Sequence, residues 1–122
     1  MAEHRSVRLT TVLGDRLRFR RMAGEEARYR ATLRPWLWFL CRSADCRIFQ
    51  DQDVKEIVST VLGDLGIDEK QQSFRLAGAY PKREYCVQYN ESALSFVSRL
   101  LEEEGITFYS DKGDGGELLV FE

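Results

Sequence analysis

The stretch from Arg83 to Tyr109 restricts the possible folds more than any other, because it carries the signals of a strand, a helix and a second strand in direct succession. Tyr85, Val87 and Tyr89 alternate with a cysteine and a glutamine. This period of two predicts a strand with one aromatic-rich face. Each element of the unit has an apolar face, so the unit must pack against something else.

The residues after this strand predict an amphipathic helix at about 91–104, because apolar side chains recur there at helical spacing. Asn90 is expected to cap its start by accepting backbone N–H groups. Gly105 is expected to end it, since glycine readily adopts the left-handed conformation found at helix C-termini. The expected apolar stripe consists of Leu94, Phe96, Val97, Leu100 and Leu101.

A second amphipathic helix is predicted at about 53–65, where apolar residues from Val54 to Leu65 follow the helical period. Residues 106–109 and 118–121 predict a closing β-hairpin around a polar, glycine-rich tip at 111–116. The expected fold class is therefore α+β, with antiparallel strands and two amphipathic helices.

The N-terminal part predicts another hairpin, because residues 7–13 and 16–22 alternate apolar and polar residues around a Gly14-Asp15 turn signal. One face would be apolar and the other cationic. The arginines in and after it form a candidate basic patch: Arg16, Arg18, Arg20, Arg21, Arg28 and Arg30.

Charge is distributed unevenly along the chain. Residues 1–47 contain 11 Lys/Arg and 5 Asp/Glu, whereas residues 48–122 contain 7 and 15. Such asymmetry is typical of a nucleic-acid-binding half, but it also fits a solvated arginine face or a basic segment against an acidic neighbour. A solvated arginine face or a basic segment against an acidic neighbour is preferred over nucleic-acid binding, because nothing in the basic half resembles a nucleic-acid-binding motif.

The segment from Tyr29 to Leu40 contains the densest apolar run of the chain. Residues 29–34 alternate, which predicts a long half-buried strand, and Pro35 is expected to bend or end it. Core packing and a subunit interface both explain the run that follows, because exposed tryptophans would leave a large apolar area in water. The candidate interface is Trp36, Leu37, Trp38 and Phe39.

Two longer blocks resemble one known family. REYCVQYNES…FVSRLLEEEGI, which begins at Arg83, is similar to the signature of VgrG proteins, and YRATLRPWLWFLCRSADCRIFQ, which begins at Tyr29, is similar to their upstream block. The blocks follow one another in family order. VgrG proteins are the spike proteins of bacterial type VI secretion and are related to the hub proteins of contractile phage tails.

The resemblance implies a phage tail hub-like fold and a structural role, in a trimeric hub that caps a tube of Hcp rings. The start of the chain, including FRRMAGEE, resembles the family's extreme N-terminus, which most of a barrel separates from the Tyr29 block in the family. We therefore expect an internally deleted and C-terminally truncated version. Residues 1–28 would be a hairpin remnant of the first hub barrel, and residues 29–122 an α+β hub domain.

The same resemblance implies partners. Further copies of the chain, as a dimer or a trimer, Hcp-type tube protein and baseplate components are expected. Nucleic acid is the alternative partner, through the basic patch, and a membrane is not expected, because no apolar run approaches the roughly 20 residues of a membrane helix. No signal peptide is recognisable, so we expect synthesis in the cytoplasm and export by the type VI secretion apparatus.

The residues predict no catalytic set. His4 is the single histidine, and the three cysteines lack the further ligands of a zinc site. The adjacent glutamates at 102–104 point about 100° apart on a helix and cannot converge on one ion. We expect no enzymatic activity, no cofactor and no metal.

Overall fold

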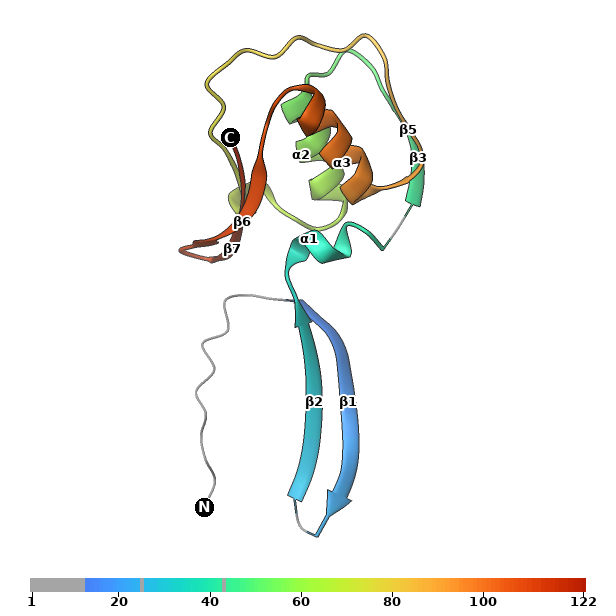
Figure 1. The fold of residues 1–122 in the computed structure, drawn as a ribbon, viewed down its shortest axis with the longest axis vertical. Helices are drawn as coiled ribbons and strands as arrows, with labels where there is room; N and C mark the ends of the chain where they lie inside the picture. Colours follow the sequence, from blue (N-terminus) through green and yellow to red (C-terminus); the bar gives the residue numbers. More distant parts are fainter. Residues whose placement is uncertain (1–12, 25, 43) are drawn as a thin grey trace.

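The computed structural model describes residues 13–122 except 25 and 43, and the side chains of residues 13–23, 26–28 and 39 are outside the description. Figure 1 shows two parts, an α+β body and a hairpin that projects from it along the longest axis. The hairpin consists of β1 (Leu13–Ala23) and β2 (Glu26–Arg34), and the short helix α1 (Trp36–Phe39) connects it to the body. The predicted α+β class is confirmed.

The body places two helices between two small sheets (Figure 1). The helices are α2 (Val54–Asp64) and α3 (Ala93–Glu103). Antiparallel β3 (Ala44–Phe49) and β5 (Cys86–Ser92) form the sheet beside α3. A 3₁₀ turn, η1 (Glu69–Gln71), leads into the second sheet, which has the order β4–β7–β6. Its strands are β4 (Gln72–Phe74), β6 (Phe108–Gly113) and β7 (Gly116–Phe121).

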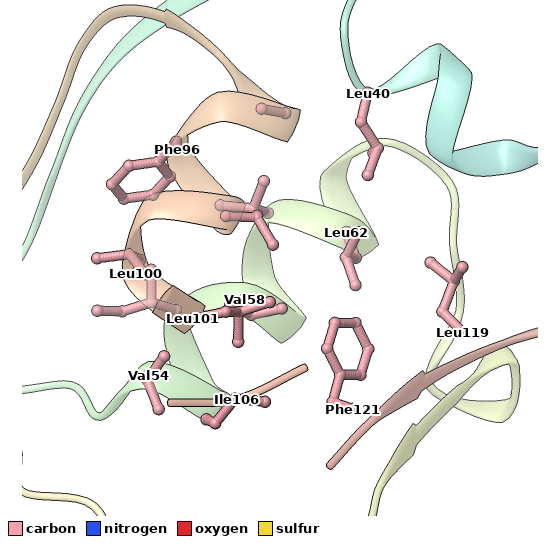
Figure 2. Packing of buried hydrophobic residues seen from close by; sticks show 14 of the residues in the cluster. Leu40, Val54, Val58, Leu62, Phe96, Leu100, Leu101, Ile106, Leu119 and Phe121 are labelled. Atoms are coloured by element: carbon pink, nitrogen blue, oxygen red, sulfur yellow. The ribbon is translucent and has the colours of Figure 1, made fainter. Parts of the chain in front are cut away.

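The core lies where the two helices meet each other and the second sheet (Figure 2). The predicted stripe of α3 is buried except at Leu94, which is half-buried and packs against its edge. The stripe of α2 is buried up to Leu62, and Leu65, at the C-cap, is exposed. Phe121 of β7 stacks on Phe74 at 4.6 Å between ring centroids, so the second sheet closes the core.

Side-chain caps determine where both helices begin. Asp53 and Glu56 form a reciprocal capping box at the start of α2. At α3 the predicted cap is wrong: Ser92, not Asn90, accepts from the Ser95 N–H, at 3.1 Å. The reason is that β5 continues through Asn90 and pairs with β3 as far as Ser92, so the helix starts two residues later. Gly105 ends the helix with a φ of 70°, as predicted.

The N-terminal hairpin differs from its prediction. β1 runs straight through the Gly14-Asp15 signal and pairs with β2, with register irregularities at Gly14/Arg16 and Arg20/Ala23. A turn is assigned instead at Gly24, which has a φ of 72°, so the predicted Gly14-Asp15 turn is wrong. Residues 7–12, its predicted first strand, lie outside the described residues. The expected domain boundary at 28 falls inside β2.

Two further expectations about local structure are wrong. The strand at 29–34 is not half-buried, because Tyr29 and Leu33 are both exposed. The apolar run after Pro35 forms the helical turn α1 rather than a strand buried on both faces. The cause is that Pro35 ends the strand at the point where the chain enters the body. The closing hairpin is longer than predicted, and its turn is reduced to Asp114 and Gly115.

Candidate interface

The helix α1 fastens the hairpin to the body through two contacts of its backbone. Pro35 at the N-cap has no side chain that can cap the helix, and the Trp36 N–H is bound instead by the distant Glu117 carboxylate, at 3.0 and 3.3 Å. Glu117 is buried on β7 and also accepts from the Ser110 hydroxyl, at 2.6 Å. At the other end of α1, the Leu40 carbonyl accepts from the Leu94 N–H of α3, at 3.0 Å. These contacts set the direction in which the hairpin leaves the body.

The predicted interface run is divided between the core and the surface. Trp36 is buried in the core, so the core-packing alternative holds for it. Leu37 is partly buried and packs against the same core. Trp38 is half-buried, and the guanidinium groups of Arg34 and Arg42 lie 4.7 and 4.9 Å from its ring centroids, within cation–π range. The side chain of Phe39 is outside the description, and an interface role for residues 37–39 stays a prediction.

The predicted basic patch lies along the projecting hairpin. The register pairs Arg18 with Arg30 and Arg20 with Arg28 across the two strands. Of the six predicted arginines, the structure describes the side chain of Arg30 alone, and it is exposed. The hairpin therefore brings paired arginine positions together on the backbone, and what those arginines bind stays a prediction.

The sequence reasoning missed an exposed apolar surface on the first sheet. Tyr85, Val87 and Tyr89 were predicted to form one face of a strand, and that face points to solvent with exposed fractions of 58%, 38% and 78%. Ile48 of β3 pairs with Val87 across the sheet and is 58% exposed. We call these four residues the outer face. The sequence contained one signal for this exposure, the alternation of these residues with Cys86 and Gln88. Cys86 and Gln88 are smaller or polar, and both are buried on the inner side of the sheet.

Ion pairs hold the outer face in position from behind. Arg83, just before β5, binds Glu103 and Glu104 at the end of α3, at 2.8 and 2.9 Å. Arg99 of α3 binds Glu91 at 2.7 Å and donates to the Val87 carbonyl at 3.1 Å. Both ends of β5 are thus tied to α3, so the outer face is carried on a supported strand.

These contacts also explain the shifts in arginine pKa. Partial burial alone would lower the pKa of Arg83, but its hydrogen bonds with Glu103 and Glu104 outweigh burial and raise it. The hydrogen bond with Glu91 raises the pKa of Arg99 against a smaller opposing effect of burial. Both guanidinium groups therefore stay charged and structural.

The described residues contain no group of three or more His, Cys, Asp or Glu side chains close enough to hold a metal ion. His4 lies outside the described residues. Within the part of the chain that the structure describes, no helix has the length and apolarity to cross a membrane. The features that stand out in the described structure are the exposed outer face and the projecting hairpin.

This architecture, two helices between small sheets with a projecting hairpin, is that of a tail-hub domain. It is similar to the E. coli c3393 protein, described as a component of the type VI secretion system with structural similarity to the T4 bacteriophage tail proteins gp27 and gp5. The TM-score is 0.76 at 34% sequence identity, and the match covers 90% of this chain and 31% of that one. Residues 8–122 match the family described as Phage tail baseplate hub (GPD), and the chain belongs to this family.

Curated relatives agree with this assignment. The type VI secretion system spike protein VgrG1c of Pseudomonas aeruginosa is 51% identical over 87 residues, which are 71% of this chain and 12% of the relative. VgrG1b of the same organism is 46% identical over 97 residues, 80% of this chain and 13% of the relative. The actin cross-linking toxin VgrG1 of Vibrio cholerae is 41% identical over 93 residues, which are 76% of this chain and 8% of the relative. The chain thus spans about an eighth or less of the length of these relatives.

Proposed function

We propose that this chain is a structural part of a type VI secretion spike or a related contractile tail hub, and that it acts by assembly rather than by catalysis. The observation that carries the proposal is the hub fold itself, which matches the c3393 protein over 90% of the chain. The exposed outer face supports it further, because an apolar sheet face of this kind marks a contact surface.

The proposed partners are other copies of this chain, in a dimer or trimer, together with Hcp-type tube protein and baseplate components. Synthesis in the cytoplasm and export with the spike follow from the same role. The hairpin β1–β2 is proposed to be the remnant of the first hub barrel, and the α+β hub domain to begin at α1. We propose the boundary at residue 35 in place of residue 28, which lies within β2.

A chimera tests the proposed role directly. The segment of P. aeruginosa VgrG1c that matches this chain would be replaced by the corresponding residues of this chain, and export of the chimera would be measured in a strain without the native protein. We expect export comparable to the native spike. A matched chimera with Leu101→Asp, which places a charge in the core, should not be exported. A folded, stable chimera that is never exported would contradict the proposal.

A further inference from the structure

Among the side chains that the structure describes, the exposed large hydrophobic residues are concentrated in two places. Seven large hydrophobic side chains are exposed among the described residues, and six of them lie either on the outer face or on β2. On β2, Tyr29 is 65% and Leu33 40% exposed. The remaining one, Leu65, lies by itself at the end of α2. The described side chains therefore form two exposed apolar surfaces, one on the body and one on the hairpin.

The register shows that the hairpin surface is a row along one face. Tyr29, Ala31 and Leu33 are alternate residues of β2, so they share a face of the ribbon. Across the ladder, Phe19 pairs with Tyr29 and Leu17 with Ala31. We call Tyr29, Ala31 and Leu33 the hairpin row. Figure 1 shows the hairpin extending from α1 away from β3 and β5, so the row and the outer face of one copy do not meet.

We propose that the hairpin row of one copy packs against the outer face of a second copy, in a head-to-tail contact. This inference rests on the proposed function, in which copies of the chain assemble, and it names the two surfaces that meet. The hairpin is a ribbon of two strands, and the outer face lies on the two-stranded sheet of β3 and β5, whose inner side packs against α3. Face-to-face packing would therefore cover the exposed apolar side of each.

Charge selects this contact over the symmetric alternative. Residues 13–34, the hairpin, contain seven Lys/Arg and three Asp/Glu, a net charge of +4. Residues 44–122, the body, contain eight and sixteen, a net charge of −8. A head-to-tail contact brings a cationic hairpin to an anionic body, whereas two outer faces packed together would bring two anionic bodies into contact.

Area limits the strength of a single contact. A tyrosine buries about 150–250 Å², so each of the two surfaces can bury only a few hundred Å². A stable interface needs roughly 800 Å² from each partner. In a head-to-tail assembly each copy uses both surfaces, and every copy of a closed ring is held twice. The contact is therefore expected to be weak in a pair and stronger in a ring.

Two double variants test the contact. The face variant carries Ile48→Ser and Tyr89→Ser, and the hairpin variant carries Tyr29→Ser and Leu33→Ser. All four side chains are at least 40% exposed, so the fold should persist, and circular dichroism would verify it. Leu65→Ser, an exposed apolar residue outside both surfaces, is the matched control. Association would be followed by sedimentation velocity under reducing conditions at about 100 μM, where a contact of micromolar affinity is saturated.

We expect both double variants to associate at least about tenfold more weakly than the wild type and the control. A mixture of the two variants should form pairs that grow no further and associate more weakly than the wild type, because the intact hairpin of the face variant still fits the intact outer face of the hairpin variant, but only one contact holds each pair. Association of the wild type should also weaken as salt is raised, since opposite charges meet.

Three results would overturn the inference. A monomeric wild type would remove the contact altogether. Weaker association of the face variant alone, with the hairpin variant unchanged, would indicate symmetric packing of two outer faces. Association unchanged in both variants would locate the interface elsewhere. Export of the VgrG1c chimera is measured separately from association. The chimera can be exported even if the contact is absent, and the contact can be present even if the chimera is not exported.

Discussion

Replacing Glu117 with alanine should destabilise the protein well beyond what a glutamate near a hairpin turn would ordinarily cost. The carboxylate is buried, holds the Trp36 N–H at 3.0 and 3.3 Å, and accepts from Ser110 at 2.6 Å. The alanine variant removes hydrogen bonds to a charged group, and it leaves the buried Trp36 N–H without a partner. Each of these effects costs about 1–3 kcal/mol, and because they overlap we expect a total of about 2–4 kcal/mol.

Urea denaturation followed by tryptophan fluorescence would measure this cost, because Trp36 lies at the contact itself. Ser110→Ala should cost less, about 1 kcal/mol, since it removes one donor and leaves the Trp36 N–H bound. Glu102→Ala, on the exposed side of α3, is the control and should change the free energy of unfolding by less than about 0.5 kcal/mol. If Glu117→Ala lowered the free energy of unfolding no more than Glu102→Ala does, the Glu117 carboxylate would not hold α1 on the body, and the proposed attachment of the hairpin would be wrong.

Leu101→Ala, in the core, should cost about 2–5 kcal/mol through lost burial and a residual cavity. The same change at the exposed Leu65 should cost far less in thermal denaturation, and equal costs would show that the α3 stripe is not core. Duplex DNA should not be retarded at roughly physiological salt, and retardation that falls steeply with added salt would favour the nucleic-acid alternative. Partial burial and then the charge of Glu122 raise the pKa of Tyr109. A phenol with a raised folded-state pKa contributes stability that is complete below the unfolded-state value, about 10, and is lost as pH rises through the folded-state value. Tyr109→Phe should therefore flatten the alkaline fall in the unfolding midpoint, and an unchanged fall would exclude this phenol as its cause.

The two helices were predictable because their signals are local. A helix needs an apolar stripe and acceptable ends, and both are present within a few turns of sequence, as in Asp53 to Gly66. The resemblance to VgrG also required only the order of residues, and family membership and the hub fold confirm it. Errors in these regions were limited to ends, such as Asn90, where strand pairing with β3 moved the cap to Ser92.

The surfaces were decided by tertiary structure, because a period of two defines two faces but not which of them is buried. At β5 the alternation predicted an aromatic-rich face but not whether that face is buried. The inner side is nevertheless taken by Cys86 and Gln88, whose amide donates to the Glu91 carbonyl at 3.0 Å. The position of the turn in the first hairpin was likewise not determined by the sequence, since Gly14 and Gly24 both offer a flexible position.

The sequence by itself determined the helices, the α+β class and the family, because each depends on spacing along the chain. Only the tertiary structure could place the Trp36 N–H on Glu117, 81 residues away in sequence, and leave Ile48, Tyr85, Val87 and Tyr89 outside. A contact across such a separation has no local periodicity. It arises only when packing of the core brings α1 and β7 together, and the exposure of the outer face follows from the same packing.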